Sequence, residues 1–88
     1  MSRYDGRMPS VTVKFFGPAR DLADTDEIRL DLGEGERLGA LAGRIAGKFD
    51  KLGRIPGFRL AVNRSFVPLD HKLNDGDEVA VIPPVSGG

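Results

Sequence analysis

The stretch EIRLDLGEGERLGALAGRIAGKFD, Glu27 to Asp50, decides the fold class because its hydrophobic period changes at a turn. Apolar and polar residues alternate over 27–32, which predicts a half-buried strand. GEGE at 33–36 is typical of a turn, and helical spacing of apolar residues then predicts an amphipathic helix over about 37–50. The inward residues are Ile28, Leu30 and Leu32 on the strand, and Leu38, Leu41, Ala42, Ile45 and Phe49 on the helix. A strand that leads directly into a helix indicates an α+β domain.

Further strands are predicted at both ends of this stretch: VTVKFF at 11–16, FRLAVN at 58–63, FVP at 66–68 and EVAVIP at 78–83. GPARDLADTD at 17–26 predicts a long loop with room for one helical turn, which would join the first two strands as a hairpin. The order β-β-α-β-β-β predicts a mixed sheet of four to five strands with one main helix packed on one face. The expected core is Val11, Val13, Phe15, Ile28, Leu30, Leu38, Leu41, Ile45, Leu60, Val62, Val79 and Val81. The side chains expected to point away from the helix are Phe16, Ala61, Ala80 and Ile82.

Three glycines, Gly39, Gly43 and Gly47, are spaced four apart along the predicted helix. Each glycine costs about 1 kcal/mol relative to alanine in a helix interior, so the helix needs tertiary packing to form. Two interpretations remain open for them. One flank of the helix packs closely on a neighbouring segment, or the glycines are merely tolerated.

Composition excludes several classes of function. The 88 residues allow one domain, and 13 basic residues balance 13 acidic ones, which argues against non-specific binding to nucleic acid. No apolar run is long enough to span a membrane, and residues 1–10 have no secretory h-region, so a cytoplasmic location is expected. The chain has no cysteine, which excludes disulfides, thiolate catalysis and cysteine-ligated metals. We expect a flexible leader over 1–10, a domain over 11–82 and an extended tail over 83–88.

No constellation of side chains in the sequence predicts catalysis. His71 is the one histidine and stands in a polar loop between Asp70 and Lys72. The acidic residues of 21–27 lack the spacing of a calcium loop, and the glycine-rich stretch at 33–39 lacks the lysine of a P-loop. The chain is therefore expected to bind no metal and no cofactor, and to supply no catalytic side chain.

The C-terminal sequence PPVSGG, residues 83–88, is the feature that predicts a function. Pro83 and Pro84 favour a stiff, extended exit from the last strand, with Val85 and Ser86 following as small residues. Gly87 and Gly88 have no side chains and can thread a channel too narrow for a Cβ atom. Six extended residues reach about 20 Å, and the group they carry is the Gly88 carboxylate.

This chain resembles ubiquitin and its relatives of the β-grasp fold in its element order and its terminal Gly-Gly. Within that fold, PPVSGG preceded by DGDEVAVI is similar to the small, sulfur-carrier subunit of molybdopterin synthase. VKFFGPARDLADTDE at 13–27 also resembles the first strand and loop of that family, and the likeness covers about residues 11–88. The family commonly has a Thr or Ser cap near the helix start, where this chain has GEGERL; that departure bears on the stability of the helix and not on the function.

The resemblance implies that an ATP-dependent, ubiquitin-activating-type enzyme adenylates Gly88 and that a persulfide donor converts it to a thiocarboxylate. The tail would then enter the large synthase subunit, in a heterotetramer, and give its sulfur to the cyclic pyranopterin precursor. Two charged carriers are needed per pterin. In this interpretation Gly88 is the covalent carrier site, and Pro83, Pro84, Val85, Ser86 and Gly87 bind the partners together with Phe16 and Ile82. The chain itself is a non-catalytic subunit of a sulfurtransferase.

Three alternatives remain open. The chain could be a ubiquitin-like modifier whose Gly88 is joined to lysine amines, since Gly-Gly serves that chemistry equally well. It could carry sulfur for thiamine or cysteine synthesis. It could also be a β-grasp binding module with an incidental Gly-Gly end.

Overall fold

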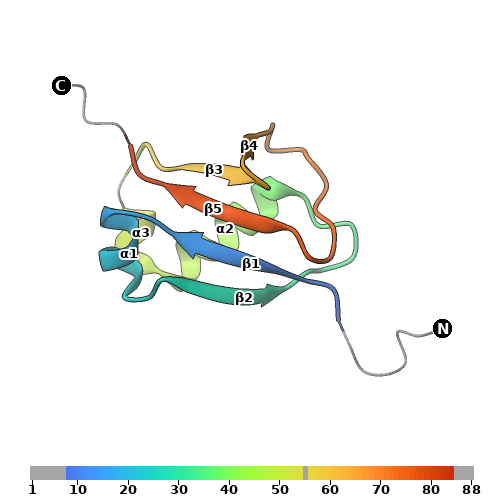
Figure 1. The fold of residues 1–88 in the computed structure, drawn as a ribbon, viewed down its shortest axis with the longest axis horizontal. Helices are drawn as coiled ribbons and strands as arrows, with labels where there is room; N and C mark the ends of the chain where they lie inside the picture. The colour runs from blue at the N-terminus through green and yellow to red at the C-terminus, as the bar shows by residue number, and fades with distance from the viewer. Residues whose placement is uncertain (1–7, 55, 85–88) are drawn as a thin grey trace.

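The computed structural model describes residues 8–54 and 56–84, and its elements follow the predicted order (Figure 1). The strands are β1 (Ser10–Phe15), β2 (Glu27–Asp31), β3 (Arg59–Val62), β4 (Ser65–Phe66) and β5 (Glu78–Ile82). The helices are α1 (Pro18–Ala23), α2 (Leu38–Lys48) and α3 (Asp50–Gly53). The predicted α+β fold, a mixed sheet of five strands with one main helix, is confirmed. Val85 to Gly88 of the predicted tail and residues 1–7 of the predicted leader lie outside the described residues.

The sheet has the strand order β2-β1-β5-β3-β4. β1 pairs antiparallel with β2, as the predicted hairpin requires, and it pairs parallel with β5. β3 pairs antiparallel with both β5 and β4. Figure 1 shows α2 and α3 behind the sheet, and among the described residues no helix covers the opposite face. The strands β1 and β5 run in the same direction and end at the same edge, beside α1.

The core lies between the sheet and α2, as the alternation of each strand predicts. Val13 and Val79 are direct partners across β1 and β5, and both have no exposed surface, as does Leu41 of α2. Phe15 meets Phe49 edge-to-face at 5.1 Å between ring centroids. Nine of the predicted core residues are buried: Val11, Val13, Phe15, Leu38, Leu41, Ile45, Val62, Val79 and Val81. The other three, Ile28, Leu30 and Leu60, are partly buried and pack against the same cluster.

The sequence prediction omitted part of the core. The residues it missed are Ala19, Ala23, Leu52 and Leu73, whereas Leu32, which was predicted to point inward, is buried as expected. Two of them belong to α1, which occupies part of the predicted loop. Pro18 stands in its first turn, where proline is favoured because the first helical N–H groups have no partner within the helix. Burial of Ala19 and Ala23 therefore stabilises α1. The helix is too short for its hydrophobic spacing to be recognised in the sequence.

The start of α2 is capped by backbone carbonyl groups of a distant loop, in place of the Thr or Ser side chain that is common in the family. No side chain caps the helix at Arg37. Instead, the Leu38 N–H donates to the His71 carbonyl oxygen at 2.9 Å, and the Gly39 N–H donates to the Leu69 carbonyl oxygen at 2.8 Å. Two of the N–H groups that a helix leaves unpaired are thereby satisfied.

The close approach of that loop explains one of the three helix glycines. A Cβ atom on Gly39 would lie 3.3 Å from the Leu69 carbonyl oxygen, whereas at Gly43 and Gly47 it would meet nothing within 4 Å. Close packing therefore applies to Gly39, and Gly43 and Gly47 have open space beside them.

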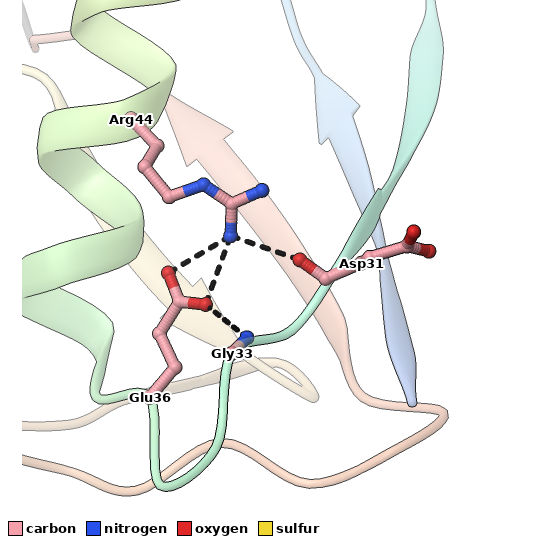
Figure 2. Close-up of polar contacts among 4 residues, drawn as sticks. All are labelled: Asp31, Gly33, Glu36 and Arg44. Carbon is pink, nitrogen blue, oxygen red and sulfur yellow. Dashed lines mark hydrogen bonds and ion pairs between the residues drawn. The ribbon is translucent and has the colours of Figure 1, made fainter. Parts of the chain in front are cut away.

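A charged cluster ties α2 to the strand that precedes it (Figure 2). Arg44 Nη1 donates to the Asp31 carbonyl oxygen at 2.9 Å and to both Glu36 carboxylate oxygens, at 2.8 and 3.0 Å. The Gly33 N–H donates to Glu36 Oε1 at 2.7 Å. Burial acts to raise the pKa of Glu36, but the Gly33 and Arg44 interactions together outweigh it and hold the pKa below its ordinary value of 4.5. The ionised Glu36 carboxylate thus stabilises the turn at residues 33–36.

Candidate functional site

The face of the sheet opposite the helices carries a continuous row of side chains from four strands. Lys14 is paired with Ala80, Ala80 with Ala61, and Ala61 with Phe66. Ala61 and Ala80 are only 6% and 9% exposed although no helix covers them. Ala61 and Ala80 have small side chains in the middle of this row, and their neighbours Lys14 and Phe66 have longer ones.

Exposed apolar side chains surround Ala61 and Ala80. Phe16 is 46% exposed and Phe66 is 54% exposed, while Ile82 is half-buried. We call Phe16, Ala61, Phe66, Ala80 and Ile82 the apolar face. Exposed apolar residues gathered on one face make this face the candidate binding surface of the described residues. Its position agrees with the sequence prediction that Phe16, Ala61, Ala80 and Ile82 point away from the helix.

Phe66 is the member of the apolar face that sequence reasoning missed as a candidate binding residue. It belongs to β4, which is only two residues long, and its place on this face depends on its pairing with Ala61. The sequence signal was the isolated aromatic residue in FVP, at an expected sheet edge. The Arg59 guanidinium lies 3.9 Å from the centroid of the Phe66 ring and restrains it. Such stacking contributes about 0.5–1 kcal/mol at exposed sites.

Charged side chains lie beside the apolar row. Lys14 Nζ is 3.5 Å from Glu78 Oε1, and both side chains are more than one third exposed. Exposed pairs of this kind contribute little to stability, about 0–1 kcal/mol. The pair instead adds a polar rim next to Ala80, as is typical of surfaces that bind another protein.

The root of the C-terminal arm lies at the same edge of the sheet as Phe16. We call residues 83–88 the arm and Pro83 and Pro84 its root. β5 ends at Ile82, after which Pro83 is half-buried and Pro84 is exposed. Because β1 and β5 are parallel, the Phe16 that follows β1 comes level with the end of β5, and its N–H donates to the Val81 carbonyl oxygen at 3.4 Å.

Four of the predicted site residues are therefore brought together: Phe16, Ile82, Pro83 and Pro84. The remaining predicted site residues, Val85, Ser86, Gly87 and Gly88, lie outside the described residues. The described residues therefore place an exposed apolar face next to the arm root.

Other features of the molecule lie away from this face. An apolar cavity of about 190 Å³ is on the helix side of the sheet, between α2, α3 and β3. Within residues 8–54 and 56–84, no group of three His, Cys, Asp or Glu side chains could hold a metal ion. No helix in that part of the chain is long and apolar enough to cross a membrane.

Comparison with known proteins gives full-length relatives. The model of the ThiS family matches residues 13–88. The molybdopterin synthase sulfur carrier subunit of Escherichia coli is 42% identical over 83 residues, which cover 89% of this chain and 99% of the relative. The protein of the same name from Mycobacterium tuberculosis is 36% identical over 83 residues, covering 92% and 100%. The chain therefore belongs to the ThiS family.

Solved structures show the same fold. A protein described as molybdopterin converting factor subunit 1, from Pyrococcus furiosus, superimposes with a TM-score of 0.80 at 36% identity, covering 88% of this chain and 99% of that one. Small archaeal modifier protein 1 from Methanosarcina acetivorans gives a TM-score of 0.77 at 26% identity, covering 94% and 100%. Subunit 1 or 2 in the complex of the molybdopterin-converting factor from Helicobacter pylori gives 0.66 at 26% identity, covering 90% and 99%. The fold is the ubiquitin-like β-grasp that the element order predicts.

Proposed function

We propose that this chain is the sulfur carrier subunit of a molybdopterin synthase, acting in the biosynthesis of the molybdenum cofactor. The observation that carries the proposal is its near full-length similarity to proteins of that name, at up to 42% identity. The C-terminal sequence supports it, because the arm ends in Gly87 and Gly88 and the chain contains no thiol that could hold sulfur.

The chemistry takes place on the Gly88 carboxylate. A carboxylate is a poor acyl donor because it has no good leaving group, so an ATP-dependent adenylating enzyme first joins it to AMP and releases pyrophosphate. The outer sulfur of a donor persulfide then attacks the acyl carbon and AMP leaves. A second thiol of the donor cleaves the S–S bond, which forms a disulfide on the donor and leaves a thiocarboxylate on Gly88. The carrier then gives this sulfur to the cyclic pyranopterin precursor.

The arm delivers the reactive group to the active sites of partner proteins. Gly87 and Gly88 have no Cβ atom, so the end of the arm can enter a channel in the partner that is too narrow for side chains. The catalytic side chains belong to the partners, and this chain contributes the acyl group. Val85 and Ser86 connect that slim end to the arm root and contact the walls of the channel.

The apolar face is the surface on which the partners dock. Phe16 and Ile82 lie on it next to the arm root, so a protein bound there is within reach of the arm. The Helicobacter pylori complex of subunits 1 and 2 supports the large synthase subunit as one partner. The adenylating enzyme uses the same face, so the two partners bind in turn and exclude one another.

The proposal is tested by reconstitution. The chain carrying a C-terminal thiocarboxylate, mixed with the large subunit and the cyclic pyranopterin precursor, should convert the precursor to a dithiolene product. The control is the same chain with an ordinary carboxylate, which should give none. Equal yields from the two forms, or no product from the thiocarboxylate form, would refute the sulfur-carrier role.

A second function, protein modification, is favoured by the similarity to small archaeal modifier protein 1 of Methanosarcina acetivorans. Activation of Gly88 is common to both functions, but the fate of the acyl group differs. A modifier would be recovered from cells joined to lysine side chains through isopeptide bonds. A carrier would be recovered free, with its terminal thiocarboxylate.

A further inference from the structure

We infer that Gly17 and Gly57 are positioning residues that grip the arm root and fix the direction in which the reactive end leaves the sheet. The inference rests on the proposed function, because it concerns how the arm is presented to a partner. It is carried by the contacts of Pro83 and Pro84, both of which the structure describes.

The two glycines lie just beyond the last residues that pair with β5, one on each side of that strand. On one side, the last parallel pair is Phe15 with Val81, and the same register brings Gly17 opposite Pro83. On the other side, the antiparallel pair of Arg59 with Ile82 brings Gly57 opposite Pro84 by the same reasoning. Proline has no N–H to donate, so hydrogen bonding from the arm root to its neighbours is removed at these positions.

The two glycines leave space beside the proline rings that a side chain would fill. A Cβ atom built on Gly17 would lie 3.4 Å from Pro83 Cγ, and one built on Gly57 would lie 3.0 Å from Pro84 Cβ. The second distance is shorter than ordinary van der Waals contact, so an alanine at Gly57 would displace Pro84 or the loop. A side chain at position 17 would touch the Pro83 ring and one at position 57 would crowd the Pro84 ring, so glycine at both positions leaves room for the arm root.

Backbone conformation makes glycine necessary at both positions. Gly17 has φ +54° and Gly57 has φ +96°, in the region that residues with a side chain rarely adopt. Gly17 stands at the point where the chain leaves the β5 ladder for α1, and Gly57 precedes the point where β3 begins to pair with β5. The two glycines thus flank the arm root where the β5 pairings end.

A gripped root has a functional consequence. Both prolines have a fixed φ angle, and holding them against backbone restricts the directions available to the residues that follow. A reactive group that arrives in a restricted set of orientations loses less entropy when it enters a partner's channel. Gly17 and Gly57 would therefore raise the rate of reaction at Gly88 without contributing to docking on the apolar face.

The test compares Gly57→Ala and Gly57→Leu with Gly76→Ala and Gly76→Leu. Gly76 is a matched control, because its φ is +88° and a Cβ atom there would meet nothing within 4 Å. Both pairs introduce the same backbone strain, and melting curves select variants that remain folded. Two quantities are measured: the ¹³Cα order parameter of Pro84 in the free protein, and the kcat and KM of pyrophosphate release by the adenylating enzyme.

In the wild type and the Gly76 variants we expect a Pro84 order parameter of about 0.85, falling below about 0.6 in Gly57→Leu. We expect kcat to fall about tenfold in Gly57→Ala and about a hundredfold in Gly57→Leu, with KM unchanged. A wild-type Pro84 that is already mobile would overturn the inference, as would a mobile Pro84 in Gly57→Leu with normal kcat. If the wild type is never adenylated although Pro84 is rigid, the proposed function fails, and the positioning role fails with it.

Discussion

Arg44 Nη1 lies 2.8 Å from Glu36 Oε1, which joins the middle of α2 to the turn that precedes the helix. The Glu36 side chain is only 7% exposed, so its charge is held away from most of the solvent. Arg44 also donates to the Asp31 carbonyl oxygen at the end of β2. The ion pair therefore links strand, turn and helix at the place where the hydrophobic period of the sequence changes.

The first prediction concerns the pH dependence of stability. Because the pKa of Glu36 is lowered in the folded state, its stabilisation is complete above the ordinary value of 4.5 and is lost as pH falls through the lower folded-state value. Glu36→Gln should reduce the free energy of unfolding by about 1–2 kcal/mol at neutral pH. The difference from the wild type should shrink once the pH is below the folded-state pKa.

Denaturant titrations across this pH range measure the effect. Glu34→Gln is the control, since Glu34 is exposed in the same turn. A Glu36→Gln difference that stays constant from neutral to acidic pH would show that the charge of Glu36 does not stabilise the fold.

The second prediction separates two glycines of α2. Gly43→Ala should raise the free energy of unfolding by about 0.8–1 kcal/mol, because alanine favours helix and the added methyl group meets open space. Gly39→Ala should give little or no gain, because its methyl group would lie 3.3 Å from the Leu69 carbonyl oxygen. Chemical denaturation compares the two variants, and equal gains would mean that the loop at Leu69 does not constrain the helix start.

The third prediction concerns docking. Phe16→Asp should weaken binding of the large subunit and of the adenylating enzyme by about tenfold or more, because it places a charge in the apolar face. Leu69→Asp is the matched control: Leu69 is 64% exposed, more than Phe16 at 46%, but is not part of the apolar face. Calorimetry should show normal affinity for Leu69→Asp, and normal affinity for Phe16→Asp would remove the apolar face from the docking model.

The fourth prediction concerns the shape of the arm's end. Gly87→Val should abolish adenylation of Gly88, because a branched side chain does not fit a channel that admits backbone alone. The melting temperature should be unchanged, since the buried core lies within residues 11–81. Normal adenylation of Gly87→Val would show that the end of the arm does not enter a narrow channel.

Much of the fold could be predicted because alternation and helical spacing report directly on which face of each element is buried. Val11, Val13 and Val79 were found in this way. Leu73 was not, because it is an isolated apolar residue that only tertiary contacts bury. Leu52 was not, because it follows the predicted end of the helix at about residue 50, although it continues the spacing of Ile45 and Phe49. The capping of α2 by the carbonyl oxygens of a loop more than thirty residues away likewise has no local signal.

Part of the candidate site could also be proposed from the sequence, and part required the structure. The Gly-Gly end, Phe16 and Ile82 carry their own chemical or positional signals in the sequence. Phe66 joins the apolar face only through the register of β4, and Gly57 meets Pro84 only through the register of β3 with β5. Register between strands distant in sequence is set by packing of the whole sheet, so these relationships required the structure.

The central claim is that the Gly88 carboxylate carries sulfur, and intact-mass measurement tests it most directly. Incubation with the adenylating enzyme, ATP and a persulfide donor should raise the mass of the chain by the replacement of one oxygen with sulfur. A chain extended by one residue beyond Gly88 should show no such change. The account would be contradicted if the wild-type mass did not change, or if the extended chain acquired sulfur without being trimmed.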